Sequence, residues 1–310
     1  MAETSVLTPQ AHLQKLEWKV LKRLDGALQG DYRTLFRGHG VDLADLRGYQ
    51  LHDDVRHIDW NVTARLTTPH VRQFTEERDL TAWFLLDLSP SIDFGSQRRK
   101  REVSEAFVAV MATIVLRHGN RAGAVLYGSS LDTVLPAKSG RMHVLHLMQR
   151  MRARPSAAAT GTTRLADLIE RARPSIKRRS AVFVVSDFIS ESGWESPMAR
   201  LAQKHDVVAV RLYDPLEMTM PDLGLVQLQD SETGEQVFVD TGQRGFRERF
   251  AQAAERRESA LRSALAHAGV DTLELSTEAD LGDSILRFVD ARRQRSRMAA
   301  GSMPLLRRRP

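Results

Sequence analysis

Two short, uninterrupted apolar runs constrain the fold of this chain more than any other feature. Residues 82–86 are Ala-Trp-Phe-Leu-Leu and residues 181–185 are Ala-Val-Phe-Val-Val. Strands that are apolar on both faces are typical of a parallel sheet, because helices then cover both of their faces. Amphipathic segments alternate with such runs along the chain. The pattern predicts an α/β fold with a doubly wound, mostly parallel sheet and helices on both faces.

The strands and helices of this sheet are expected to occupy residues 80–294, which we predict to be the main domain. The apolar residues of 98–118 recur at the spacing of one helix face. Other expected strands are 81–86, 122–127, 181–186, 207–212 and 272–275, and other expected helices are 141–153, 195–204, 243–268 and 279–293. Runs 225–229 and 236–240 flank a polar segment with a glycine, which predicts a β-hairpin that extends an edge of the sheet.

The two ends of the chain are expected to differ from this domain. Residues 9–28 carry their leucines and valine on one stripe, which predicts an amphipathic helix. With the polar residues that follow, it forms a predicted extension, residues 1–79, that is irregular and packed on the main domain through Trp60 and Phe74. The Ser, Met, Gly, Pro and Arg residues of 295–310 predict a disordered basic tail.

Polar oxygen-bearing residues follow both apolar runs. The first run ends in the pattern Asp-x-Ser-x-Ser at Asp87, Ser89 and Ser91, and the second ends at Asp187. A turn of glycine and threonines, residues 160–163, opens a helix between them. Ligands bind outside the carboxyl ends of the strands in such sheets, and Mg²⁺ prefers oxygen ligands. We therefore expect a metal site there; the alternative is a set of caps and turn hydrogen bonds.

The same residues resemble the metal-ion-dependent adhesion site of von Willebrand factor A domains. In that family, an Asp-x-Ser-x-Ser, a Thr in a glycine turn and a later Asp surround Mg²⁺ or Mn²⁺ directly or through water. A carboxylate of a partner protein commonly completes the shell. The resemblance implies the ligands Asp87, Ser89, Ser91, Thr163 and Asp187. Thr163 is preferred to Thr162 because Leu165 matches the apolar residue two positions beyond the family's Thr.

A second resemblance covers the chain from about residue 30 to residue 190. Residues 38–49, 64–65 and 71–79, and the segment Asp53-Asp54-Val55-Arg56-His57-Ile58-Asp59-Trp60, resemble the signature of the bacterial "domain of unknown function 58" proteins. These are von Willebrand factor A-like proteins whose genes often neighbour those of MoxR-type AAA+ ATPases. The chain has His52 where the family usually has Gly, which puts only the local turn geometry in doubt.

This resemblance implies a function in protein binding rather than catalysis. We expect a metal-dependent module that serves as an adaptor or co-factor protein of a MoxR-type AAA+ ATPase, in the remodelling or assembly of an unidentified client protein. The chain itself lacks the GxxxxGK[ST] loop of a P-loop ATPase. Trp194, beside two glutamates, is a candidate for an exposed partner contact.

Two alternatives from other classes stay open. In the first, the chain is a Mg²⁺-dependent phosphohydrolase with Asp87 as nucleophile and Asp187 as metal ligand. However, haloacid-dehalogenase-like enzymes place a second Asp two positions on as general acid, where this chain has Ser89. The second is a nucleic-acid-associated protein, since the net charge is +6. The arginines of residues 72–79 and 244–262 are interspersed with acids, a pattern more typical of solvated helices than of a phosphate track, and basic charge is concentrated only at helix ends and in the tail.

Composition limits the compartment and the kind of metal site. The chain has no cysteine, which excludes disulfides and thiolate metal sites. No stretch approaches the roughly 18 apolar residues of a membrane span, and the amino end does not resemble a secretory signal. We therefore expect a cytoplasmic protein whose metal site uses oxygen or imidazole ligands.

Overall fold

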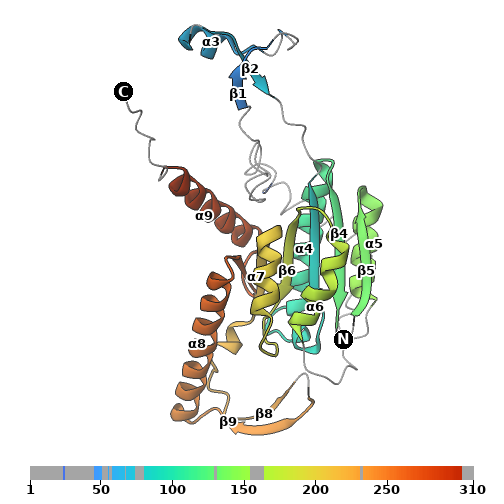
Figure 1. Ribbon diagram of the computed structural model, residues 1–310. Helices are drawn as coiled ribbons and strands as arrows, with labels where there is room; N and C mark the ends of the chain where they lie inside the picture. The colour runs from blue at the N-terminus through green and yellow to red at the C-terminus, as the bar shows by residue number, and fades with distance from the viewer. Residues whose placement is uncertain are drawn as a thin grey trace.

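The computed structural model describes residues 24, 45–50, 55, 58–66, 68–73, 80–128, 131–153, 164–230 and 233–301. Its centre is a six-stranded sheet in the order β10-β7-β6-β3-β4-β5 (Figure 1). The strands are β3 (Thr81–Asp87), β4 (Arg121–Tyr127), β5 (Leu131–Lys138), β6 (Ala181–Ser186), β7 (Asp206–Tyr213) and β10 (Asp271–Ser276). Neighbouring strands are parallel except β4 and β5, which are antiparallel. The predicted mostly parallel sheet is confirmed, and β5 is a strand that the sequence reading missed.

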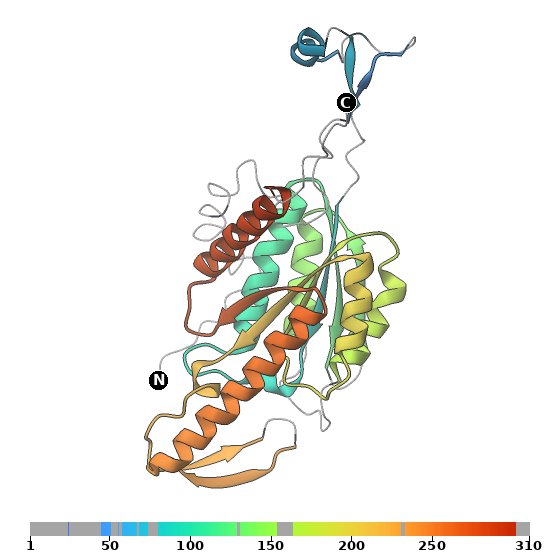
Figure 2. The ribbon, with the colours of Figure 1, turned by 60° about the vertical axis from the view of Figure 1, so that its left-hand side comes forward.

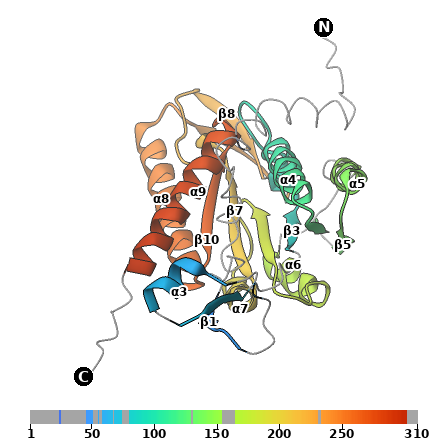
Figure 3. The same cartoon turned by 90° about the horizontal axis from the view of Figure 1, so that it is seen from above.

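Helices cover both faces of this sheet, as predicted (Figures 2 and 3). The first layer consists of α4 (Lys100–Arg117), α5 (Arg141–Arg152) and α9 (Leu281–Gly301). The second consists of α6 (Leu165–Ala172), α7 (Glu195–Lys204) and α8 (Arg244–His267). Because successive side chains of a strand point to opposite faces, Phe84 packs with the first layer and Leu85 with the second. The continuous apolar run of β3 is thereby buried on both sides.

Aromatic stacking and buried ion pairs join the layers. Phe107 of α4 packs edge-on against Phe183 of β6 with ring centroids 5.8 Å apart, and Phe183 stacks on Phe84 of the neighbouring strand β3. On the flanks, Arg211 of β7 pairs with Glu258 of α8, and Arg292 of α9 pairs with Asp206 at 2.6 Å and Asp271 at 2.7 Å. Because removing one partner of a buried pair leaves an uncompensated charge, these pairs fix where α8 and α9 lie.

The predicted hairpin is present, but it does not extend the central sheet. Strands β8 (Leu225–Gln229) and β9 (Gln236–Asp240) pair only with each other, as a separate two-stranded sheet among the described residues. The hairpin projects beside the first turns of α8 (Figures 1 and 2). The expectation that it would add to a sheet edge is wrong, because the edge strand β10 comes after it in the chain and pairs with β7.

Three further sequence expectations are corrected at the ends of the chain. The extension contains a hairpin of β1 (Asp45–Gly48) and β2 (His70–Gln73) with the helix α3 (Trp60–Leu66) between them. Trp60 is 70% exposed and is not a packing anchor. Residues 295–301 are helical as the end of α9 rather than part of a disordered tail. Phe74 and residues 302–310 lie outside the described residues, as does nearly all of 9–28.

Within the part of the chain that the structure describes, no helix is both long enough and apolar enough to cross a membrane.

Candidate metal centre at the carboxyl edge of the sheet

The candidate site lies where the chain reverses its direction of travel across the sheet. From β3 the chain moves outward to β4 and β5, and it then returns to place β6 on the other side of β3. Loops leaving two such neighbouring strands diverge, and the crevice between them is where α/β sheets bind ligands. Asp87 ends β3 and Asp187 directly follows β6, so the crevice carries both predicted carboxylates.

The first loop holds its polar groups inward. Asp87 is fully buried, and its Oδ1 accepts a hydrogen bond from the backbone N–H of Ser89 at 3.0 Å. Pro90 begins a 3-10 turn, Pro90–Asp93, which brings the hydroxyls of Ser89 and Ser91 to 3.1 Å from each other. Both serines are buried. The Asp-x-Ser-x-Ser pattern therefore gathers its oxygens at one place, as the sequence predicts.

The second loop is fastened to the first through Ser186. Its Oγ donates to Oδ2 of Asp87 at 2.7 Å and accepts the backbone N–H of Phe188 at 2.9 Å. Phe188 has φ 59°, a left-handed conformation that costs a non-glycine residue about 1–2 kcal/mol. Ile189 N–H donates to Oδ1 of Asp187 at 3.0 Å. The tight loop holds Asp187 beside Asp87.

The two carboxylates interact electrostatically. Burial, followed by the negative charge of Asp187, raises the pKa of Asp87 to about 6, although hydrogen bonds from Ser186 and Ser89 oppose the shift. Both of these hydrogen bonds come from neutral donors. A buried carboxylate that faces a second carboxylate is stabilised by a cation between or beside them.

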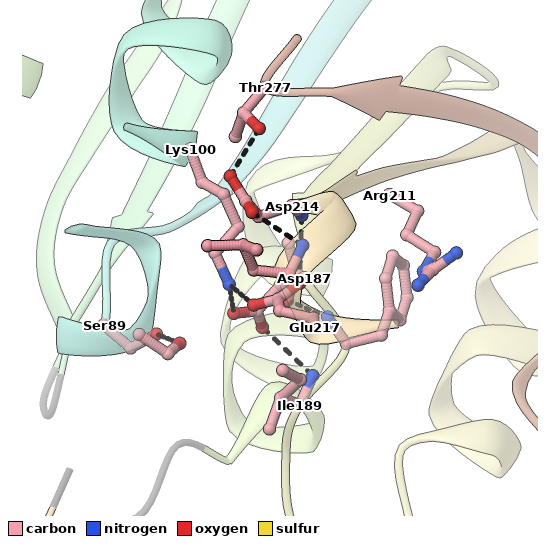
Figure 4. Close-up of polar contacts among 12 residues, drawn as sticks. Ser89, Lys100, Asp187, Ile189, Arg211, Asp214, Glu217 and Thr277 are labelled. Atoms are coloured by element: carbon pink, nitrogen blue, oxygen red, sulfur yellow. Dashed lines mark hydrogen bonds and ion pairs between the residues drawn. The ribbon is translucent and has the colours of Figure 1, made fainter. Parts of the chain in front are cut away.

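Lys100 is a member of the site that the sequence reading missed. It is the first residue of α4 and only 1% exposed, and its Nζ lies 2.6 Å from Oδ2 of Asp187 and 2.7 Å from Oε1 of Glu217 (Figure 4). Burial lowers its pKa, but the two carboxylates outweigh that effect and the net pKa is raised. The ammonium therefore stays charged. Its position three residues before Val103 on the buried stripe of α4 is the signal that could have identified it.

Asp214 positions Glu217 for this contact. The two residues form a reciprocal capping box: Asp214 Oδ1 accepts Leu216 N–H at 2.9 Å, and Glu217 Oε2 accepts Asp214 N–H at 3.1 Å. Oδ2 of Asp214 also accepts the hydroxyls of Ser96 at 2.8 Å and Thr277 at 2.6 Å. One carboxylate thus joins the loops after β7 and β10 to the loop before α4.

The third predicted segment is described only in part. Thr163 and Thr162 lie outside the described residues, so their part in the site stays a prediction. Arg164, the next residue, pairs with Glu191 at 3.1 Å, and the N–H of Leu165 donates to Ser190 Oγ at 2.9 Å. The start of α6 therefore contacts the loop that carries Asp187.

Apolar side chains flank the polar centre. Phe94, just after the 3-10 turn, is 41% exposed, and Ile189, two residues after Asp187, is 36% exposed. Trp194 was expected at the surface, but it is 5% exposed because it packs edge-on against Phe188 with centroids 5.4 Å apart. Phe94 and Ile189 are thus exposed apolar side chains of this rim in the part of the chain that the structure describes, and Trp194 packs beneath the Asp187 loop.

The donor chemistry is compatible with a hard divalent cation. Asp87, Ser89, Ser91 and Asp187 offer only oxygens, and the paired hydroxyls are suitable ligands for Mg²⁺ or Mn²⁺. Among the described residues, no group of three or more His, Cys, Asp or Glu side chains is arranged to hold a metal. A cation at this site would therefore need serine hydroxyls as well as carboxylates as ligands. Lys100 would remain a second positive group in contact with Asp187.

The sequence was compared with known families and proteins. Residues 45–260 match the family described as "Protein of unknown function DUF58". An uncharacterized protein of Mycobacterium tuberculosis is 36% identical over 287 residues, which are 92% of this chain and 90% of that protein. The uncharacterized protein YeaD of Bacillus subtilis is 25% identical over 156 residues, which are 49% of this chain and 36% of that protein.

Solved structures give partial likenesses. An aerotolerance-related membrane protein from Bacteroides fragilis is 14% identical, with a TM-score of 0.46, over 70% of this chain and 99% of that one. The "SpRpn10 VWA domain" is 13% identical, with a TM-score of 0.38, over 68% of this chain and 94% of that one. The assignment to a family comes from the sequence matches: over 45–260, with its close mycobacterial relative, the chain belongs to the DUF58 family.

Proposed function

We propose that this protein is a metal-dependent protein-binding module whose binding surface is the carboxyl edge of its sheet. The observation that carries the proposal is the buried pair of Asp87 and Asp187, in which burial, followed by the charge of Asp187, raises the pKa of Asp87 to about 6. Ser89 and Ser91 add hydroxyl oxygens beside it. The exposed Phe94 and Ile189 next to this pair give a partner an apolar surface to cover.

In this proposal, Mg²⁺ or Mn²⁺ is held by Asp87, Ser89, Ser91, Thr163 and Asp187, and it supplies an electrophilic position for a carboxylate of the partner. The protein's own residues orient the oxygens. Ser186 holds Asp87, Ile189 N–H holds one oxygen of Asp187, and Lys100 holds the other. These fixed contacts limit the reorganisation that binding would require.

The partner we propose is a MoxR-type AAA+ ATPase, with the module acting as its adaptor or co-factor protein toward a client, in the cytoplasm. The support is the signature shared with the DUF58 family in the segments before β3. A binding role also agrees with the rim chemistry, because Ser89 stands where a phosphohydrolase of the haloacid-dehalogenase type would need a general acid. We accordingly propose that the chain is not an enzyme.

Calorimetry and affinity capture test this function together. Wild type should bind Mn²⁺, and it should capture the ATPase from its host only when divalent metal is present. Asp87→Asn keeps the shape of the side chain but removes its charge, so both binding events should be lost. Asp290→Asn removes an exposed carboxylate of α9 and is the matched control. Capture that persists in chelator, or in Asp87→Asn, would show that the metal is not required.

A phosphatase assay separates the catalytic alternative. Turnover of an aryl phosphate with Mg²⁺ that disappears in Asp87→Asn, but not in Asp290→Asn, would replace the binding function with hydrolysis. We expect no turnover from either protein.

A further inference from the structure

The β8–β9 hairpin is an apolar surface that the proposed metal-dependent function leaves unused. Of the thirteen large apolar side chains exposed among the described residues, five belong to residues 223–238: Leu223, Leu225, Leu228, Val237 and Phe238. They lie on both faces of the hairpin, since Leu225 and Phe238 share one face and Leu228 pairs with Val237 on the other. An isolated two-stranded sheet is marginally stable and its outer edges can accept another strand.

The charge of the hairpin segment indicates which kind of strand could add to its edge. Residues 219–243 contain five acids and no lysine or arginine, although the whole chain is basic. On the neighbouring helix α8, Arg247 pairs with Asp222 at 3.3 Å. A strand that adds here gains from basic side chains as well as apolar ones, because rim charges of opposite sign favour association.

One segment of this chain has both properties. Residues 305–309 are Leu-Leu-Arg-Arg-Arg, between Pro304 and Pro310. Proline lacks the N–H needed in a ladder and is found at strand ends and edges, so the segment between the prolines can pair over five residues. Both β8 and β9 are also five residues long. The segment contains no acid.

The same molecule cannot supply this segment to its own hairpin. Arg292 of α9 contacts Asp206 and Asp271, the first residues of β7 and β10, so α9 runs to the sheet edge opposite the hairpin (Figure 1). Its 21 residues measure about 31 Å. If 305–309 were paired, only 302–304 would remain as a tether, and three residues reach about 10 Å.

We propose that residues 305–309 of one molecule add as a third strand to the β8–β9 hairpin of a second copy, and that the protein assembles head to tail. Main-chain hydrogen bonds along the hairpin edge provide the pairing. Because successive side chains of a strand point to opposite faces, one leucine covers the face of Leu225 and Phe238 and the other covers the face of Leu228 and Val237. The three arginines face an acidic segment. Such an interface joins two different surfaces, so it forms rings or open chains rather than a symmetric dimer.

Sedimentation of the full chain tests this assembly without metal. Wild type should show association that rises with protein concentration and weakens with salt. Deletion of 302–310 and the double change Leu225→Asp with Phe238→Asp should each give monomers. Met142→Asp alters an equally exposed apolar residue on α5 and should associate like wild type. Circular dichroism of each variant verifies that the domain remains folded.

A mixture of the two monomeric variants tests directly whether the tail of one molecule binds the hairpin of another. The tail-deleted protein keeps its hairpin and the hairpin variant keeps its tail. Together they should form a one-to-one heterodimer that is joined by one tail–hairpin contact and cannot add further molecules. A wild type that stays monomeric at high concentration, an association that both variants retain, or a mixture that fails to form the heterodimer would overturn the proposal. Since chelator is present throughout, these outcomes are independent of the metal-dependent function.

Discussion

Lys100 and Asp187 form a buried ion pair, Nζ to Oδ2, at 2.6 Å, at the rim where a divalent cation is proposed to bind. The same ammonium contacts Glu217 at 2.7 Å. Asp87 lies beside Asp187, and Asp214 is joined to Glu217 through their capping box, so the carboxylates in this part of the rim outnumber the single ammonium. Lys100 therefore stabilises Asp187 in the protein without metal and leaves a net charge that metal can neutralise.

Replacing Lys100 by methionine should destabilise the protein and increase its response to metal. Asp187 and Glu217 would be left without their buried counter-ion, which costs about 3–5 kcal/mol for one partner of a buried pair. Denaturant unfolding with and without Mg²⁺ measures both effects, and Mg²⁺ should stabilise Lys100→Met more than wild type. Lys204→Met, on the exposed end of α7, should change neither quantity. Equal Mg²⁺ responses in all three proteins would contradict a shared role for Lys100 and metal.

Asp87→Asn should stabilise the metal-free protein at neutral pH. The folded protein holds the pKa of Asp87 at about 6, against 3.8 ordinarily, so ionising this carboxyl is less favourable in the folded state. The associated stability is present below about pH 4 and is lost as the pH rises through about 6. At about 1.4 kcal/mol per pH unit, the variant should gain up to about 3 kcal/mol at pH 7. A loss of stability in chelator would show that the hydrogen bonds of Asp87 outweigh its desolvation.

The affinity for metal should rise with pH, whereas the stability of the metal-free protein falls. A cation binds the ionised carboxyl, so protons compete with it below the pKa of Asp87, which burial and Asp187 raise to about 6. If one proton is displaced, the apparent affinity for Mn²⁺ should fall about tenfold for each pH unit below that value. Electron paramagnetic resonance of free Mn²⁺ measures this directly. A flat profile between about pH 7 and pH 5 would exclude Asp87 as the titrating ligand.

Ile189→Ser should separate partner binding from metal binding. The Ile189 side chain is 36% exposed beside the site, whereas the hydrogen bond of Ile189 to Asp187 is made by its backbone N–H, which the substitution keeps. The change should weaken capture of the AAA+ ATPase, as loss of an apolar contact at an interface does, and leave Mn²⁺ affinity within about twofold. Met142→Ser on α5 is the control for an exposed apolar residue away from the rim. Unchanged capture would place the partner elsewhere.

Removing one member of the Arg211–Glu258 pair should destabilise the protein strongly, whereas replacing both residues with apolar ones should destabilise it little. Arg211→Met leaves Glu258 buried without its counter-ion and should lower the free energy of unfolding by about 3–5 kcal/mol. The double variant Arg211→Met with Glu258→Leu removes both charges and should recover most of that loss. A double-mutant cycle by urea unfolding tests the coupling. Simple additivity would mean that the pair does not hold α8 to β7.

The sequence alone determined the parallel part of the main sheet, although not its antiparallel edge strand β5. The apolar runs of β3 and β6 are buried on both faces, and such runs read as parallel strands without any tertiary knowledge. The bounds of β8 and β9 were likewise set by the polar, glycine-containing turn between them. Asp87, Ser89 and Ser91 could be assigned to one site because residues at alternate positions after a strand are close together, independently of the tertiary structure.

Only the tertiary structure decided which distant groups meet. Lys100 reaches Asp187 and Glu217 across 87 and 117 residues of sequence, and a basic run at a helix start gives no sign of which carboxylates it will meet. The same holds for Trp194, whose burial depends on Phe188 in a left-handed conformation, and for the hairpin, which stands apart because β10 takes its place beside β7. Local pattern is set by the period of a strand or helix, whereas contacts between loops depend on how the whole chain packs.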